Sequence, residues 1–166
     1  MAVNTFRIEY DFGKTNEQVI LDCIDSLVSG HDTKIVLFHN SGGLAQLAVE
    51  LGEAIANAKG KVELEAVGYV NSAAAYVFFS TWLWAPKAGI KVEEQLSTMY
   101  HCPRYDLEDM KMPLINVLTS AHQSFTALYD ALILACENAF DGYAKAKYDI
   151  GHEIVVTFPK LNRGAQ

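Results

Sequence analysis

Cysteine is scarce in this chain of 166 residues and follows no pattern. The three cysteines, Cys23, Cys102 and Cys136, are an odd number, lie far apart and include no C-x-x-C pair. This distribution predicts neither a disulfide framework nor a metal site, and it is typical of a reducing compartment such as the cytoplasm. No motif indicates a cofactor.

Basic residues are also few. Lys and Arg number 13 against 20 Asp and Glu, which gives a formal net charge of -7, and the basic side chains are scattered along the chain. A surface that binds a phosphate backbone needs clustered positive charge. Nucleic acid is therefore not an expected partner.

Long apolar runs are missing as well. The most apolar stretch, residues 73–86, is interrupted by Ser80 and Thr81. It is too short for a transmembrane helix, which takes about 20 residues. The first twelve residues lack the basic start and apolar core of a secretory signal. We therefore expect no membrane partner and a cytoplasmic location.

The residues that are abundant indicate a packed globular protein. Hydrophobic residues make up 51% of the chain and charged residues 20%, which are ordinary proportions for a domain with a core. A chain of this length buries roughly two-thirds of its unfolded surface. No linker-like segment divides it, so we predict one domain over residues 1–166.

Strand and helix patterns alternate along the chain. Period-two or continuous apolar runs predict strands, one of them ending at Gly68, at 4–12, 34–39, 62–67, 90–92, 98–100 and 153–158. Helical spacing predicts helices at about 16–29, 44–59, 73–84, 107–136 and 143–148. The first is capped by Thr15 or Asn16 and the fourth by Asp106, with Pro113 in a first turn or at a kink. The continuous run 34–39 indicates a strand covered on both faces, and the tail 160–166 is expected to fray. The alternation predicts an α/β layered fold with a mostly parallel sheet and flanking helices.

A glycine pair follows the second predicted strand, in the turn Asn40-Ser41-Gly42-Gly43. Paired glycines let the backbone turn sharply and direct its N–H groups outward at a helix start, where partial positive charge favours an anion. Such a turn suits an oxyanion hole or a phosphate site. Taken alone, a purely structural turn is the commoner use.

Ser72 opens the helix predicted over 73–84, four residues after Gly68. A hydroxyl at the end of a strand can project into the same space as the N–H of Ala73. The commonest use of serine at this position is a helix cap. The flanking residues do not form the G-x-S-x-G pattern of a nucleophile elbow.

His101 follows a predicted strand and precedes Pro103, and it is the histidine best placed to act as a base. Nothing around the adjacent Cys102 predicts the lowered thiol pKa of a nucleophile. The other histidines are expected at the glycine turn, on the surface or on a helix face: His39, His31, His122 and His152.

Together these turns resemble the proteolytic subunit of the Clp protease and its relatives in the crotonase-like superfamily. The family pattern is N-S-P-G-G, then G-x-A-x-S-M/A-G/A, then M-I-H-Q-P. Here the corresponding stretches are 39–43 (HNSGG), 68–73 (GYVNSA) and 99–103 (MYHCP), with Ser41 in place of the proline. The resemblance covers about residues 5–158 in the same order.

The resemblance implies a ClpP/crotonase-like fold and a serine endopeptidase acting on a peptide or protein substrate. It assigns Ser72 as nucleophile, His101 as general base, and the amides of Gly43 and Ala73 as the oxyanion hole. Counting back from Tyr148 makes Glu137 the acidic triad member, whereas Asp141 is the natural choice by chemistry, and we favour Glu137 narrowly. Homo-oligomerisation and an ATPase or assembly partner are also implied.

Two other functions remain open from the sequence. One is a catalytically silent ClpP-like subunit that serves in assembly or binding. The other is a crotonase-like acyl-CoA enzyme, which would use the same amide pair to hold a thioester enolate, although no adenine-pocket signature is visible.

Overall fold

The computed structural model describes residues 3–103, 120–135, 148, 151 and 153–166. Strands and helices alternate through the first hundred residues, as the sequence predicts. In chain order the elements are β1 (Asn4–Glu9), α1 (Glu17–Val28), β2 (Thr33–Asn40), α2 (Ala45–Ala56), β3 (Val62–Asn71), α3 (Ala73–Trp84), β4 (Gly89–Val92), β5 (Leu96–Tyr100), α4 (Ser120–Ala135), β6 (Ile154–Phe158) and β7 (Leu161–Arg163).

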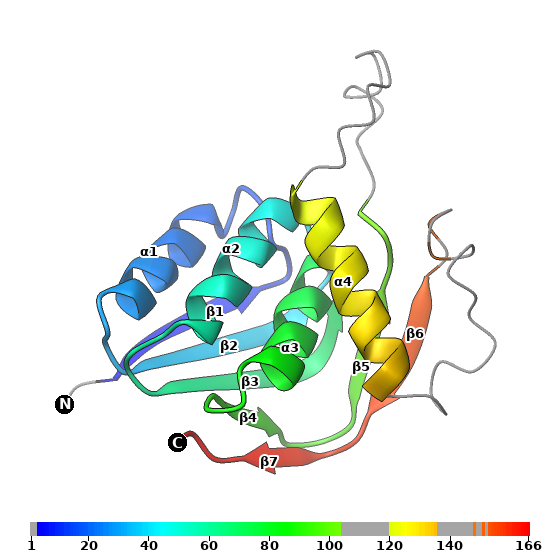
Figure 1. Ribbon diagram of the computed structural model, residues 1–166. Helices are drawn as coiled ribbons and strands as arrows, with labels where there is room; N and C mark the ends of the chain where they lie inside the picture. Colours follow the sequence, from blue (N-terminus) through cyan, green and yellow to red (C-terminus); the bar gives the residue numbers. More distant parts are fainter. Residues whose placement is uncertain (1–2, 104–119, 136–147, 149–150, 152) are drawn as a thin grey trace.

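The strands of the described residues form one sheet in the order β1-β2-β3-β4-β7 (Figure 1). The pairings β1–β2, β2–β3 and β3–β4 are parallel. β3 extends beyond the end of β4, and its last residues, Tyr69–Asn71, pair in parallel with β5. β7 and β6 add antiparallel pairs to β4 and β5. The predicted mostly parallel α/β sheet is confirmed.

The core lies between the sheet and the helices, all four of which cover the same face (Figure 1). α3 is the central helix, and every residue from Ala73 to Thr81 is buried. Along β2, Ile35 and Leu37 face this core, whereas Val36 and Phe38 are only half-buried. No described helix covers that second face, so the prediction of a strand covered on both faces is wrong. Phe38 instead packs beneath the Arg7 guanidinium, 4.2 Å from the ring centroid.

Several element boundaries differ from the predicted ones because the backbone turns where the side-chain pattern does not. α3 matches the predicted range 73–84. β1 ends at Glu9, because Tyr10 adopts a φ of 67° and leaves the strand. β3 does not end at Gly68 but continues to Asn71, since Gly68 takes a φ of 76° opposite an irregularity in β2 at His39.

The C-terminal tail is ordered by Arg163, which contradicts the predicted fraying. Its guanidinium donates hydrogen bonds of 2.9 to 3.0 Å to the carbonyls at the end of α3 and just beyond, those of Thr81, Trp82, Ala85 and Ala88. A helix leaves its last carbonyls without intrahelical partners, and a fork of N–H donors satisfies several of them together. The tail thus closes the end of α3 while β7 pairs with β4.

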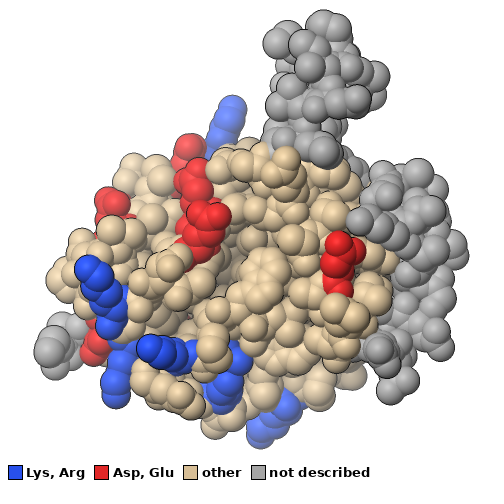
Figure 2. Space-filling view, viewed as in Figure 1, with Lys and Arg blue, Asp and Glu red and all other residues tan. Residues whose placement is uncertain are grey.

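Charged side chains are unevenly spread over the surface. Figure 2 shows mostly uncharged atoms over α3 and α4, with Lys and Arg along the edge where α2 and α3 end. Lys59, Lys61 and Lys87 belong to that edge. None of the helices in the described part of the chain is long and apolar enough to cross a membrane.

Candidate functional site

Three turns meet at the carboxyl edge of the sheet, where β2, β3 and β5 end. The N–H of Ser72 donates to the carbonyl of Met99 at 2.7 Å, which fixes the end of β3 against β5. Gly42 lies directly against Ser72, because a Cβ on Gly42 would stand 2.6 Å from the Cβ of Ser72 and 3.0 Å from the amide nitrogen of Ala73. Crevices outside the carboxyl ends of strands are where open α/β sheets bind ligands.

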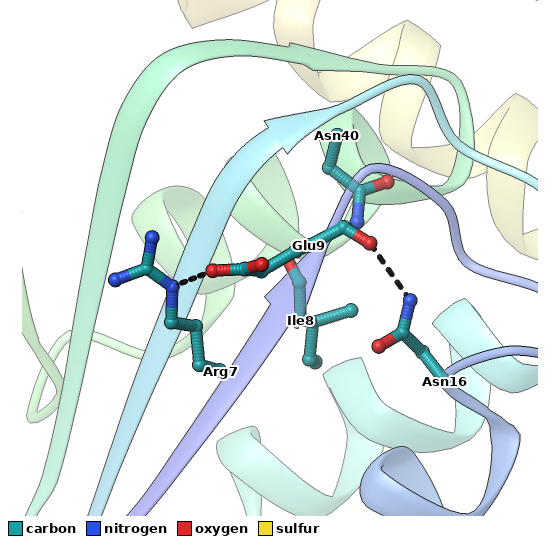
Figure 3. A network of polar contacts seen from close by, with 5 residues as sticks. All are labelled: Arg7, Ile8, Glu9, Asn16 and Asn40. Atoms are coloured by element: carbon teal, nitrogen blue, oxygen red, sulfur yellow. Dashed lines mark hydrogen bonds and ion pairs between the residues drawn. The ribbon is translucent and has the colours of Figure 1, made fainter.

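Asn40 holds the glycine turn in shape. Its side chain is fully buried, and its amide donates to the carbonyls of Ile8, at 3.3 Å, and Asp11, at 3.0 Å. Its Oδ1 accepts the N–H of Gly42 at 2.9 Å. In Figure 3 Asn40 reaches across to the end of β1 beside Ile8. From the sequence, Asn40 is expected only as a turn residue, and no local pattern predicts this function.

Asn16 holds the loop that follows β1, to which Asn40 also bonds (Figure 3). It precedes α1, as predicted for a cap, but its side chain makes no capping hydrogen bond. It donates instead to the carbonyls of Glu9, at 2.8 Å, and Asp11, at 2.9 Å. The Glu9 carboxylate pairs with Arg7. The loop after β1 is therefore fixed where the glycine turn rests on it.

Gly43 directs its amide away from that loop. The N–H of Phe12 donates to the carbonyl of Gly42, and the N–H of Leu44 donates to the carbonyl of Phe12, both at 2.8 Å. Because neighbouring residues of an extended chain point their polar groups to opposite sides, the N–H of Gly43 faces the other way. It finds no acceptor among the described residues. Glycine is needed at position 43 because its φ is 154° and a Cβ there would lie 2.7 Å from the Phe12 carbonyl.

Ser72 has a strained backbone, with φ 52° and ψ -116°. It forms the sharp turn between β3 and α3, and its side chain makes no capping hydrogen bond, so the common cap interpretation is wrong. A non-glycine residue in such a region costs about 1–3 kcal/mol, and such residues cluster at active sites. The turn matches the strained strand-to-helix geometry of a nucleophile elbow, although the G-x-S-x-G sequence is absent.

Ala73 is the first residue of α3, so its N–H has no partner within the helix. Its amide nitrogen lies close to Gly42. The first turn of α3 is Ala73, Ala74 and Ala75, all fully buried, whose small side chains let the neighbouring backbone approach. A helix start of this kind carries partial positive charge that favours an anion.

His101 lies just beyond β5 with only 9% of its surface exposed. Its Nδ1 is 2.6 Å from the carbonyl oxygen of Cys102. A carbonyl only accepts hydrogen bonds, so Nδ1 carries the proton and Nε2 is the basic nitrogen of the neutral ring. Glu137 and Asp141, the two predicted acidic triad members, lie outside the described residues.

Cys102, which follows His101, contacts a second imidazole. The Sγ of Cys102 is 3.0 Å from Nε2 of His122 on α4. His122 lies on a helix face, as expected; it is half-buried there and touches a residue 20 positions earlier. No local sequence pattern signals this contact, since it depends on how α4 packs against β5.

Several cavities lie along the sheet, and two of them are compared with the position of the turns. One, of about 250 Å³, lies at the carboxyl edge and is lined by His39, Gly68 and residues 92–95. The larger, of about 780 Å³, lies at the opposite edge between the ends of α2 and α3, away from Ser72. The site is assigned to the carboxyl edge because the strained serine and the free amide lie there. Within the described ranges no group of three or more His, Cys, Asp or Glu residues is arranged to hold a metal.

Comparisons with known proteins add structural evidence. No protein-family model matches the chain, and no curated protein matches it. Among solved structures it is similar to a point mutant of ClpP1 from Listeria monocytogenes, with a TM-score of 0.52 over 92% of this chain and 82% of that chain. The fold is ClpP-like. At 15% identity the likeness shows the ClpP-like fold alone, and the wider crotonase-like relationship stays a prediction.

Proposed function

We propose that this ClpP-like chain is a serine peptidase that hydrolyses peptide bonds through an acyl-enzyme on Ser72, with His101 as general base. The observation that carries the proposal is the backbone of Ser72, at φ 52° and ψ -116° between β3 and α3. Glycine would occupy this conformation without strain. A serine there whose hydroxyl does not cap the helix is best explained by a chemical use of that hydroxyl.

The proposed reaction uses His101 and two backbone amides together with that hydroxyl. Nε2 of His101 takes the proton of Ser72 Oγ as the oxygen attacks the substrate carbonyl. The amides of Gly43 and Ala73 then donate to the oxyanion, each worth on the order of 100-fold in rate. His101 passes its proton to the leaving amine, and a water molecule repeats the sequence to release the acid.

The proposed acidic member of the triad is Glu137, with Asp141 as the alternative. Its carboxylate would stabilise the imidazolium that forms during the reaction. Glu137→Gln and Asp141→Asn separate the two, because only the true member should lower activity strongly. If both variants are as active as the unaltered chain, neither Glu137 nor Asp141 is the acidic member of the triad.

The proposed substrate is a peptide or protein, and the proposed active form is a homo-oligomer, working with an ATPase or an assembly partner. The open face of the sheet supports association, since Val36 and Phe38 are half-buried there. Large apolar side chains are also exposed on α4 and β6, with Leu134 at 77% and Val155 at 62%. Molar mass measured by light scattering tests the oligomer.

A fluorophosphonate probe tests the chemistry directly. We expect the unaltered protein to be labelled at Ser72 and Ser72→Ala to remain unlabelled. Ser41→Ala is the matched control, because Ser41 lies in the neighbouring turn and its hydroxyl donates to the Tyr10 carbonyl. Absence of labelling in the unaltered protein would contradict the peptidase proposal and favour a catalytically silent assembly subunit. Calorimetric binding of an acyl-CoA in that case would favour the crotonase-like alternative.

A further inference from the structure

Tyr100 and Cys102 lie two residues apart at the end of β5 and both contact α4. The ring of Tyr100 stacks on Phe125, with centroids 5.6 Å apart, and its hydroxyl donates to the Phe125 carbonyl. Cys102 contacts His122 one turn earlier on the same helix. The thiol is thus enclosed between strand and helix, and only 4% of the residue is exposed.

The contact between Cys102 and His122 is chemically specific. With Sγ and Nε2 3.0 Å apart, the thiol can donate its proton to the ring nitrogen, which leaves a thiolate beside an imidazolium. A thiolate is the reactive form of cysteine, and a histidine within hydrogen-bond reach is the usual way to generate it. A cysteine kept only for packing has no need of such a partner.

A second, independent observation is the hydroxyl of Tyr148. The residue is 1% exposed, and its hydroxyl makes no hydrogen bond of standard geometry among the described residues; the hydroxyls of Thr126 and Tyr100 and the thiol of Cys102 are its polar neighbours. Burial, and after it the neighbouring Cys102 thiol, raises the pKa of this hydroxyl. A buried donor without a well-placed acceptor raises the free energy of the folded state, because it loses its hydrogen bonds to water. An anion on Cys102 would supply the acceptor.

We propose that Cys102 is a second nucleophilic centre, a thiol activated by His122 and oxidised by hydrogen peroxide. The thiol proton passes to Nε2 of His122, and the thiolate attacks one oxygen of the peroxide. The S–O bond forms as the O–O bond breaks, and the leaving hydroxide takes the proton from the imidazolium to become water. Cys102 is oxidised by two electrons to a sulfenic acid, and the peroxide is reduced.

Oxidation at Cys102 would also act on the neighbouring site, a consequence that rests on the proposed function. The carbonyl of Cys102 holds Nδ1 of His101 at 2.6 Å. An added oxygen atom on a thiol that is 4% exposed must displace the residue or α4, because protein interiors hold few voids. The base is then misoriented, and Ser72 becomes less reactive.

The experiment is treatment of the intact protein with hydrogen peroxide in the presence of dimedone, which traps sulfenic acids, followed by peptide mapping of each cysteine. We expect Cys102 to be modified at least tenfold faster than Cys23. Cys23 is a control within the same molecule, since it is fully buried and burial raises its pKa to about 12. Equal rates at the two cysteines would overturn the proposal.

Variants identify the activating group. His122→Ala should slow the modification of Cys102 at least tenfold, and Tyr148→Phe should slow it a few-fold. Cys23 also reports folding, because its reactivity rises if a variant unfolds. An unchanged rate at Cys102 in a folded His122→Ala protein contradicts the activated thiol. Fluorophosphonate labelling of Ser72 before and after peroxide is a separate readout, so failure of the peptidase proposal leaves the mapping of Cys102 decisive.

Discussion

The turns after β2 and after β3 lie at the same edge of the sheet, and each leads the chain from a strand into a helix by a different backbone conformation. After β2, the turn is spread over four residues, uses two glycines at positive φ and is fixed by the buried side chain of Asn40. After β3, the turn is a single residue, Ser72, which takes the positive φ without glycine. The first turn is built for a defined backbone, and the second retains a particular side chain at a cost in stability.

Contact between the turns makes Gly42 the most sensitive position of the pair. We expect Gly42→Ala to lower the free energy of unfolding by about 3 kcal/mol or more, or to prevent folding. The reason is that the new Cβ would lie 2.6 Å from both Asn71 O and Ser72 Cβ, at a φ of 90°. Urea unfolding measures the loss. Gly13→Ala is the control, since its Cβ would meet nothing closer than 3.4 Å, and equal losses would mean that the turns are independent.

Removing Asn40 tests whether the first turn depends on its side chain. Asn40→Ala leaves the buried N–H of Gly42 without its acceptor and takes one donor from the carbonyls of Ile8 and Asp11, the second of which keeps Asn16. We therefore expect a loss of about 2–3 kcal/mol, measured by the same unfolding experiment. Asn57→Ala, which removes one exposed hydrogen bond to the Glu53 carbonyl, should cost less than about 0.5 kcal/mol. A loss at Asn40 as small as that at Asn57 would show that glycine alone shapes the turn.

The helix after the second turn can be probed by pH. Tyr76 lies in the first turn of α3, its N–H bonds the Ser72 carbonyl, and burial raises its pKa to about 12 from 10.0. The unfolded chain therefore loses this proton first, so stability is unaffected below pH 10 and falls between about 10 and 12. Tyr76→Phe should remove on the order of 2 kcal/mol of that fall. The exposed Tyr10→Phe serves as control, and an identical pH profile for both variants would contradict the buried phenol.

The smallest effect concerns the strain at Ser72 itself. Ser72→Gly should raise the free energy of unfolding by about 1 kcal/mol, because glycine adopts a φ of 52° freely. Ser72→Ala keeps the strain and should leave stability nearly unchanged. Neither variant should react with a fluorophosphonate. Thermal unfolding of the three proteins measures the difference. A glycine variant less stable than the serine protein would show that the Ser72 backbone is not strained.

The sequence predicted what depends on local pattern. The helix at 73–84 was predicted to the residue, because its apolar run opens at Ser72 and stops before Pro86. The order of the three turns and the ClpP-like fold were also predicted. Contacts between distant segments were not, and these include Asn40 with Ile8 and Cys102 with His122. The strain at Ser72 was equally hidden, since a φ of 52° has no signature in a side-chain pattern.

The hydrogen bonds of Arg163 have a consequence for biosynthesis. The carbonyls that it closes belong to residues 81, 82, 85 and 88, about half a chain earlier. During synthesis from the N-terminus, α3 keeps an open end, and β4 stays an unpaired edge, until residue 163 has left the ribosome. Unpaired strand edges invite association with other chains. The protection of this sheet edge therefore waits until residues 161–163 are available, and a chain interrupted before residue 161 exposes it permanently.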